Sequence, residues 1–243
     1  MDEKFIRTAA LIGDAGMERI FAARVAIFGI GGVGGYVAEA LARSGISKLD
    51  LIDADTVSVS NINRQIIATE KTVGKSKTAL MKERILDING KAEVRTFELF
   101  FSEETADVFD FSEYDYVIDA IDTVKSKLEL AERCRAAGVP LISSMGTGNK
   151  LDPTKLEITD ISKTSVCPLA RVMRAELRRR GINHLKVLYS KEIPIHAVVS
   201  DSQNGRHSPA SSAFVPPAAG LAIAAEVVRD IAFGRVEKGG CPI

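Results

Sequence analysis

The sequence predicts an α/β fold: a doubly wound, Rossmann-like sheet of mostly parallel strands, with a C-terminal extension of the same domain. Four short apolar runs lead to this prediction, together with the helix-period segments that lie between them. Continuous apolar runs are typical of parallel strands that are covered on both faces. Alternation of strand and helix further predicts βαβ units with right-handed crossovers. The four runs are residues 25–29, 49–53, 116–120 and 139–143.

Helix periodicity and stop signals predict the remaining elements. Gly90 and Gly138 each follow a helix-period segment and act as stops,. Residues 200–213 show little periodicity, which predicts a long loop that is either functional or disordered,. We expect helices at 37–43, 75–89, 126–137, 168–180 and 217–233, and further strands at 156–161 and 185–189.

Composition limits the class of protein. With 46% apolar and 26% charged residues, the chain of 243 residues has a globular composition,. We expect a single domain, 1–243, with a nucleotide-binding half (1–150) and a substrate-side half (151–243). The 32 basic residues balance the 32 acidic residues, which excludes a wholly basic nucleic-acid binder,.

Cysteine usage and the absence of targeting patterns predict a cytoplasmic protein without membrane association. The three cysteines form no C-x-x-C pair, which argues against a zinc ribbon or a disulfide scaffold,. No basic segment followed by an apolar core opens the chain,. The apolar stretch 217–233 contains Glu226, Arg229 and Asp230, so it predicts a buried helix and not a membrane span,.

A glycine-rich turn follows the first predicted strand and opens the first predicted helix. This is the context in which G-x-G-x-x-G binds phosphate. The glycines permit a tight turn and a close approach of backbone N–H groups to phosphate, and the helix N-terminus adds positive potential. Asp53 ends the second strand, where an acid can bind ribose hydroxyls,. The glycines are Gly29, Gly31, Gly32 and Gly34.

The residues after Asp53 favour a triphosphate over a dinucleotide. Arg64 can fork onto phosphate oxygens, and Lys77 supplies a point charge,. A triphosphate requires such cations because its β and γ groups extend past the helix, whereas a dinucleotide has no general need for them. Asp122 follows another strand, at the sheet edge that faces the ligand, and can hold Mg²⁺,.

These motifs resemble the ubiquitin-activating-enzyme-like superfamily, which includes the ThiF, MoeB and HesA proteins. The pattern runs G-x-G-G-x-G, D-x-D-x-V-x-x-S-N-x-x-R-Q, G-x-x-K and D-x-x-D over residues 29–122. The resemblance implies an enzyme that adenylates a carboxylate with Mg-ATP and forms AMP and pyrophosphate. It implies that Asp53 binds ribose and that Asp122 binds Mg²⁺. The remaining nucleotide-binding residues that it implies are Asp55, Asn61, Arg64, Gln65 and Lys77.

The N-terminal segment adds one catalytic residue and a partner. Residues 5–8 resemble the segment whose arginine reaches the ATP site of a partner subunit. The resemblance therefore implies that Arg7 acts in trans, alongside Arg64, Lys77 and Asp122, and that the protein is a homodimer. An ordinary surface arginine on an N-terminal helix is the alternative for Arg7.

The second half narrows the resemblance to ATP-dependent dehydratases that cyclise threonylcarbamoyladenosine in tRNA. Segments 152–154, 159–164 and 168–171 carry it. In the reaction implied, a threonine carboxylate is adenylated, a nearby nitrogen attacks it, and a ring forms with net loss of water. Cys167 departs from the pattern, since Asp is expected there in some relatives. Whether a monovalent cation is needed stays open.

A basic stretch supplies independent evidence for RNA. From residue 171 to 191 the only acid is Glu176. At helical spacing Arg171, Arg174 and Arg178 share one face, and such a stripe can neutralise phosphates,. The alternative is the solvated face of an amphipathic helix. We expect the opposite, apolar face to contain Leu169, Val172, Met173 and Leu177,.

Other functions remain open from the residues alone. One is an adenylyltransferase that activates the C-terminus of a ubiquitin-like sulfur carrier. A second is a non-catalytic nucleotide-binding partner of a cysteine desulfurase system, and a third is an NAD oxidoreductase. Cys167 could form a thioester or be inert beside a helix start,. We expect Cys134 in the core and Cys241 in a free tail.

Overall fold

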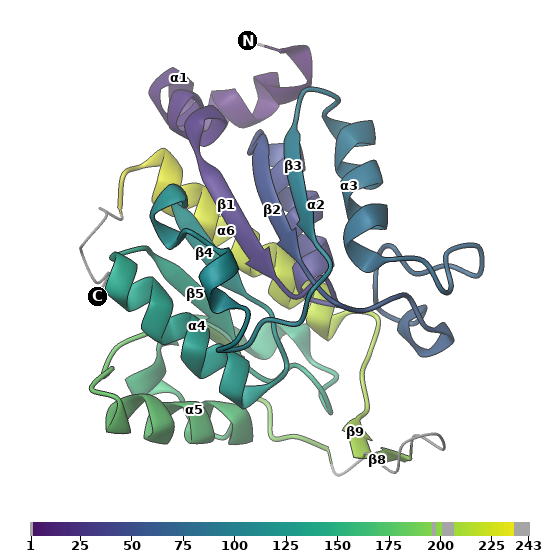
Figure 1. The fold of residues 1–243 in the computed structure, drawn as a ribbon, viewed down its shortest axis with the longest axis vertical. Helices are drawn as coiled ribbons and strands as arrows, with labels where there is room; N and C mark the ends of the chain where they lie inside the picture. The colour runs from purple at the N-terminus through teal and green to yellow at the C-terminus, as the bar shows by residue number, and fades with distance from the viewer. Residues whose placement is uncertain (1, 196–197, 201–206, 236–243) are drawn as a thin grey trace.

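The computed structural model describes residues 2–195, 198–200 and 207–235. Its main feature is a seven-stranded sheet with the order β3-β2-β1-β4-β5-β7-β6 (Figure 1). All neighbouring pairs are parallel except β6 and β7. The doubly wound α/β prediction is thus confirmed. The strands are β1 (Arg24–Phe28), β2 (Lys48–Ile52), β3 (Glu93–Phe97), β4 (Tyr116–Asp119), β5 (Leu141–Ser144), β6 (Leu156–Asp160) and β7 (Lys186–Ser190).

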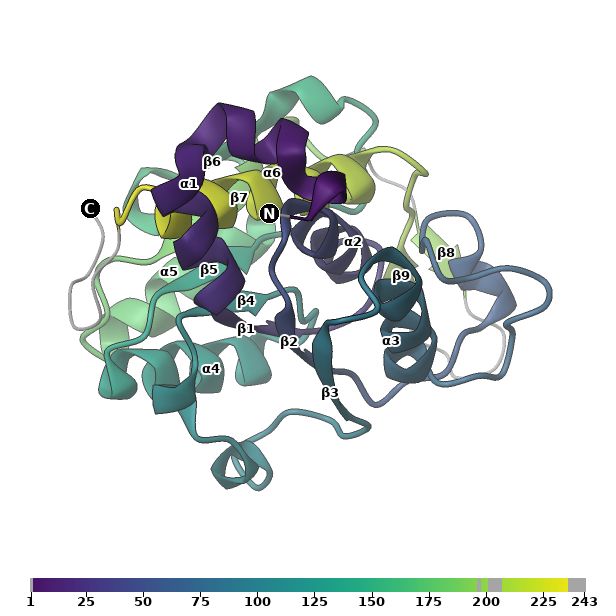
Figure 2. The same ribbon diagram turned by 90° about the horizontal axis from the view of Figure 1, so that it is seen from above.

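Helices cover both faces of the sheet (Figure 2). Alternate residues of β1 point to opposite faces, as in any strand. Val25 and Ile27 join a core cluster with α2, α3 and α6, whereas Ala26 and Phe28 join a second cluster with α4 and α5. The helices are α1 (Ile6–Ala22), α2 (Gly34–Ser44), α3 (Lys77–Ile88), α4 (Val124–Ala137), α5 (Pro168–Arg179) and α6 (Val215–Ala232).

Three segments differ from the sequence-based expectation. The apolar pattern does not predict β3, because it is an edge strand in which only Val94 is buried. It also predicts no helix bounds for α1, where Gly13 interrupts the helical backbone with a φ of 77°. The loop expected at 200–213 is partly wrong, because β8 (Val198–Ser200) pairs with β9 (His207–Pro209). Residues 201–206 lie outside the described part of the chain.

Helix α6 confirms the expected buried helix. It packs against α1 and α2 on one face of the sheet. Ile223 and Val227 are fully buried in the core cluster of that face. In the part of the chain that the structure describes, no helix combines the length and apolar character that a bilayer span requires.

The contact between α6 and α2 depends on Gly220. A Cβ atom at this position would lie 2.4 Å from the carbonyl oxygen of Val33 and 2.9 Å from Cβ of Tyr36. Both neighbours are backbone or backbone-proximal atoms, so they cannot move aside without separating the helices. Gly220 therefore sets how closely α6 approaches the start of α2, directly behind the glycine-rich turn.

We predict that Gly220→Ala lowers the free energy of unfolding by about 1–3 kcal/mol, because overpacking outweighs the better helix propensity of Ala. Chemical denaturation followed by circular dichroism measures the change. The control is Gly90→Ala, where the nearest atom to a new Cβ lies 3.6 Å away; a change within about 0.5 kcal/mol is expected there. Equal stability of the two variants would contradict the assigned role of Gly220.

Candidate nucleotide-binding site

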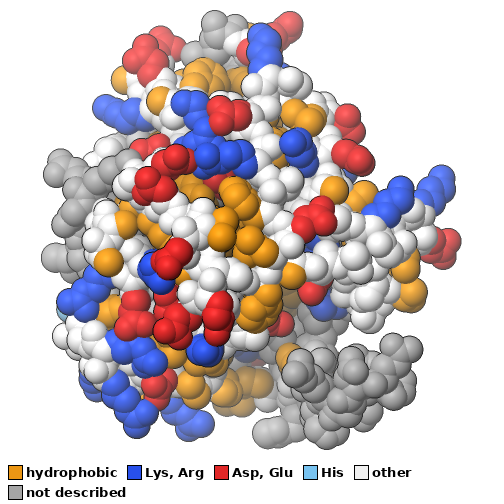
Figure 3. All heavy atoms as spheres, in the orientation of Figure 1, with side chains coloured by type: hydrophobic (Ala, Val, Ile, Leu, Met, Phe, Trp, Pro, Cys, Tyr) orange, Lys and Arg blue, Asp and Glu red, His pale blue; other side chains and the backbone are white. Residues whose placement is uncertain are grey.

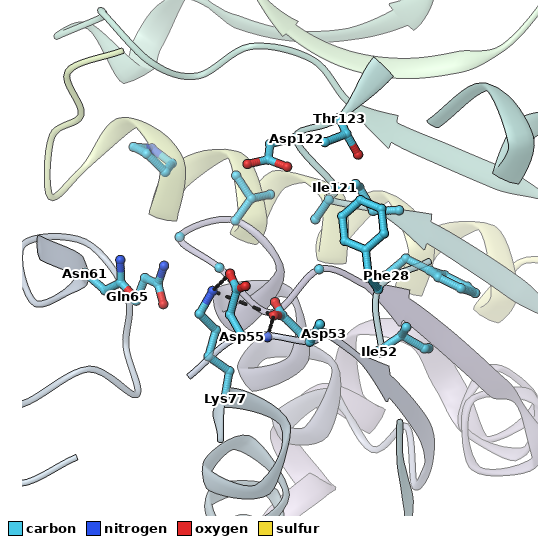
Figure 4. Close-up of a pocket in the computed structure, with 18 of the residues that line it drawn as sticks. Phe28, Ile52, Asp53, Asp55, Asn61, Gln65, Lys77, Ile121, Asp122 and Thr123 are labelled. Carbon is cyan, nitrogen blue, oxygen red and sulfur yellow. Dashed lines mark hydrogen bonds and ion pairs between the residues drawn. The ribbon is translucent and has the colours of Figure 1, made fainter. Parts of the chain in front are cut away.

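A cleft of about 690 Å³ lies at the carboxyl ends of β1, β2 and β4. Strands β2 and β4 flank β1 on opposite sides, so the chain order reverses at this point of the sheet. Ligands of open α/β sheets bind in the crevice at such a switch point. The cleft is therefore where the fold itself predicts a nucleotide, and Figure 4 shows the side chains that line it.

The glycine-rich turn forms one wall of the cleft. Gly29 has a φ of 93°, and a Cβ there would lie 2.6 Å from the carbonyl oxygen of Ala120. A Cβ at Gly34 would lie only 1.8 Å from the carbonyl oxygen of Gly29. Gly29, Gly31 and Gly32 line the cleft, while Gly34 begins α2 beneath it. The N-terminus of α2 thus belongs to the same wall.

Asp53 and Lys77 form the polar floor beside this wall (Figure 4). The Asp53 carboxylate accepts hydrogen bonds from the backbone N–H groups of Ile30, at 2.6 Å, and Asp55, at 2.8 Å. Lys77 Nζ lies 2.6 Å from Asp55 Oδ2 and 3.7 Å from Asp53 Oδ1. Burial raises the pKa of the Asp53 carboxyl, and the nearby Lys77 ammonium opposes that rise. A phosphate bound in the cleft would compete with the Asp55 carboxylate for the Lys77 ammonium group.

Arg64, Asn61 and Gln65 also line the cleft. The Arg64 guanidinium donates to the carbonyl oxygen of Ser60 at 3.0 Å, and burial lowers the pKa of this side chain. Asn61 Oδ1 accepts a hydrogen bond from the N–H of Ser58, so the side-chain amide nitrogen of Asn61 points away from Ser58. Gln65 is 6% exposed, and its Oε1 atom is buried without a hydrogen-bond partner among the residues that the structure describes. An orphaned acceptor in a cleft wall is suited to a ligand donor.

Asp122 and Thr123 close the cleft on the β4 side (Figure 4). Asp122 is exposed to the cleft, and Thr123 Oγ1 is buried with no hydrogen-bond partner in the described part of the chain. Sequence reasoning did not single out Thr123; its position before α4 was the available signal, although its hydroxyl makes no capping bond. Among the described residues, no group of three or more His, Cys, Asp or Glu could hold a metal. A single carboxylate fits Mg²⁺ that is held mainly by substrate phosphates.

Arg7 is not brought to the cleft of its own chain. It is exposed near the start of α1, at the opposite end of the sheet (Figure 1). It does not belong to the residues that line the cleft. This placement fits both the arginine that acts in another subunit and the ordinary surface arginine.

Helix α5 carries the basic stripe, and basic side chains gather over it at the lower left of Figure 3. Arg171 and Arg178 are exposed. Arg174 is half-buried and donates to Thr164 Oγ1 at 2.6 Å and to the Thr164 carbonyl at 3.0 Å, so it also holds the preceding loop. The expected apolar face is wrong for Val172, which is 43% exposed; Ala170, Met173 and Leu177 form the buried face.

The cysteines that the structure describes are buried. Cys134 is in the core, as expected, and burial raises the pKa of its thiol well above the usual range. Cys167 is the N-cap residue of α5 and is 3% exposed. Cys241 and the histidine His196 lie outside the described residues, as does the side chain of His207. A buried Cys167 favours the inert alternative over a thioester.

Comparison with known proteins identifies the family. The family model described as ThiF matches residues 5–232. The chain belongs to the ThiF family. A tRNA threonylcarbamoyladenosine dehydratase of Bacillus subtilis is 44% identical over 242 residues, which is 95% of each chain. One of Escherichia coli is 41% identical over 176 residues, which is 72% of this chain and 66% of that relative.

A solved structure agrees with the sequence relatives. The crystal structure of E. coli tRNA N6-threonylcarbamoyladenosine dehydratase, TcdA, in complex with ATP has a TM-score of 0.87 to this chain. The match has 32% sequence identity and covers 96% of this chain and 95% of that one. The resemblance to the ubiquitin-activating-enzyme-like superfamily is thus confirmed at the level of the ThiF family, over nearly the whole fold.

We predict that Gln65→Leu weakens nucleotide binding without lowering stability. Leu fills a similar volume and removes a buried unsatisfied acceptor, which by itself costs about 1–3 kcal/mol. Loss of one ligand hydrogen bond of about 0.5–1.5 kcal/mol weakens binding roughly two- to tenfold. Calorimetric titration with an ATP analogue and thermal melting test both parts. Unchanged affinity with a lower melting temperature would show that Gln65 is only structural.

Proposed function

We propose that this chain is an ATP-dependent tRNA threonylcarbamoyladenosine dehydratase. The observation that carries the proposal is the convergence of Arg64, Lys77 and Asp122 on one cleft beyond a glycine-rich turn. That arrangement suits a triphosphate better than a dinucleotide, which disfavours the NAD oxidoreductase. The named dehydratases that match over most of this chain support the substrate, threonylcarbamoyladenosine in tRNA.

The reaction proposed joins activation and ring closure. The threonine carboxylate attacks the α-phosphorus of ATP, a new C–O–P linkage forms, and pyrophosphate leaves. A nitrogen of the same side group then attacks the activated carbonyl carbon, the bond to AMP breaks, and the nitrogen loses a proton. The net loss is one water, which is transferred to ATP as AMP and pyrophosphate form. Such chemistry needs mainly positioning and charge neutralisation.

Individual residues have distinct proposed roles in this reaction. Asp53 binds the ribose hydroxyls, while Arg64 and Lys77 neutralise the charge that develops on the phosphates. Asn61, Gln65 and Asp55 complete the nucleotide site, with Asp55 holding Lys77 until phosphate arrives. Asp122 would hold Mg²⁺, which supplies charge neutralisation on the phosphates when bound. The walls formed by Gly29, Gly31, Gly32 and the turn residue Gly34 exclude water from the phosphates.

The assembly and further partners also belong to the proposal. Arg7 does not line the cleft of its own chain, which supports a homodimer in which it completes the partner's site. Residues 1–150 and 151–243 share one sheet through β5 and β7, which supports a single adenylating domain. A cytoplasmic location, a monovalent cation and a cysteine desulfurase partner stay predictions of the sequence. The sulfur-carrier adenylyltransferase is the less favoured alternative.

One experiment tests the function directly. Purified protein is incubated with Mg-ATP and tRNA that bears threonylcarbamoyladenosine, and the digested nucleosides are analysed by mass spectrometry. The modified nucleoside should lose the mass of one water, with stoichiometric AMP. An unchanged nucleoside, together with adenylation of a protein C-terminal glycine, would favour the sulfur-carrier alternative.

We predict that Lys77→Ala, Arg64→Ala and Asp122→Ala each reduce AMP formation at least about a hundredfold, because each removes charge stabilisation from the phosphates. The matched control is Lys75→Ala, since Lys75 is exposed two residues from buried Lys77. Circular dichroism should show an intact fold in all four variants. Normal AMP release by the three cleft variants would refute the ATP assignment.

We predict that Arg171→Glu combined with Arg178→Glu weakens tRNA binding and reduces its salt dependence. The slope of log affinity against log salt should fall by about one for each lost phosphate contact. Arg174 is left intact because its bonds to Thr164 are structural. Lys91→Glu, at an 86% exposed side chain before β3, serves as a charge control. Binding that is unchanged across salt would make the stripe a solvated face.

A further inference from the structure

A fully buried lysine lies behind the cleft but does not line it. Lys127 is on the first turn of α4, and its side chain is 0% exposed. Its Nζ donates to Asp119 Oδ2 at 2.9 Å, to the Ser144 carbonyl at 2.8 Å and to Ser143 Oγ at 3.3 Å. These three bonds use the full donor capacity of an ammonium group. The charge is therefore paired and completely hydrogen-bonded.

Stability alone does not explain this pair. Removing two charges from water costs several kcal/mol per ion, and well-packed apolar residues often replace such pairs without loss. A buried pair is consequently weak evidence for stabilisation. Its position is more informative, because Asp119 ends β4 while Ser143 and Ser144 end β5. The pair ties α4 to the carboxyl ends of both strands.

Asp119 transmits this constraint to the cleft. Its Oδ1 accepts from the backbone N–H of Ile121 at 3.1 Å, and its Oδ2 accepts from Ser143 Oγ at 2.5 Å. The Ile121 bond fixes the turn that leads directly to Asp122 and Thr123. At the other end of the turn, the N–H of Lys127 donates to the Thr123 carbonyl at 3.1 Å. The segment between β4 and α4 is thus held from behind at both ends.

We propose that the Lys127–Asp119 pair positions Asp122 and Thr123 for Mg-ATP. This inference rests on the proposed ATP-dependent function and adds two positioning residues to it. Neither side chain touches the nucleotide; both act through the turn at Ile121. Without the Lys127 ammonium, the Asp119 carboxylate would shift toward other hydrogen-bond donors. The turn at Ile121 would then lose the geometry that directs Asp122 into the cleft.

A second buried pair elsewhere in the sheet supplies the control. Lys186 Nζ lies 2.6 Å from Asp230 Oδ2 and 3.0 Å from Glu226 Oε1, and Asp230 is 2% exposed. Lys186 opens β7, so this pair lies at the amino ends of the strands, opposite the cleft. Disrupting it should affect stability without affecting the nucleotide site.

The test compares Lys127→Met, the double variant Lys127→Met/Asp119→Leu, and Lys186→Met. Thermal melting reports stability, and calorimetric titration of a non-hydrolysable ATP analogue over a Mg²⁺ series reports the site. Lys127→Met should be destabilised and bind poorly. The double variant should regain stability, since no charge is left unpaired, while Mg²⁺-dependent affinity stays at least tenfold below that of the wild type. Lys186→Met should lose stability and keep normal affinity.

The variant Ser143→Ala provides a second test if the double variant does not fold. It retains the ion pair but removes one bond to Asp119, so it should fold and show a smaller loss of Mg²⁺-dependent affinity. The inference is overturned if the double variant or Ser143→Ala binds like the wild type, or if Lys186→Met loses as much affinity as Lys127→Met. These titrations need no tRNA. A wild type that binds Mg-ATP but leaves tRNA unchanged would therefore refute the proposed function and not this inference.

Discussion

The site depends on one close approach of backbone to backbone, between the turn after β1 and the segment after β4. The absence of a side chain at Gly29 permits it, because a Cβ there would collide with the carbonyl oxygen of Ala120. Gly34 keeps the turn itself tight, because its Cβ would collide with the carbonyl oxygen of Gly29. As a result the ends of β1, β2 and β4 converge at one level. Asp53 can then reach the N–H of Ile30, and the N-terminus of α2 faces the same space. The contact between the turn after β1 and the segment after β4 therefore determines where the charged groups of the cleft lie.

The charges inside the cleft would allow an entering phosphate to replace the carboxylates that pair with Lys77. Lys77 is buried between Asp53 and Asp55, so a phosphate that enters must compete with carboxylates that already neutralise it. The contribution of Lys77 to the free energy of binding is the difference between its ion pair with a phosphate and its existing ion pairs with the carboxylates. This difference limits affinity but favours a ligand of high charge density. Arg64 is also half-buried, and this burial lowers the pKa of its guanidinium. In the function that we propose, a triphosphate, with several charges, would satisfy both cations at once.

Local pattern predicts the parts of the fold that are buried on both faces. Strands β1, β2 and β4 are mostly apolar and almost fully buried, so their prediction succeeds, whereas β3 exposes Glu93 and pairs through one edge only. Motif spacing likewise predicts which residues line the cleft. It does not predict that Asp55 holds Lys77, that Arg174 holds the Thr164 loop, or that the Thr123 hydroxyl has no partner among the described residues. Those facts depend on contacts between distant segments, which no local window contains.

The distribution of charge also depends on contacts between distant segments, although the net charge of the chain is zero. Residues 96–124 contain no Lys or Arg, which suggests an acidic surface when read alone. In the fold, cations from elsewhere pair with these acids: Arg95 with Glu113, Arg133 with Asp107 and Lys127 with Asp119. The basic stretch is similarly reduced, because Glu176 pairs with both Arg179 and Arg180. Exposed side chains such as Arg171 and Arg178, rather than the count of basic residues, therefore decide where α5 can attract RNA phosphates.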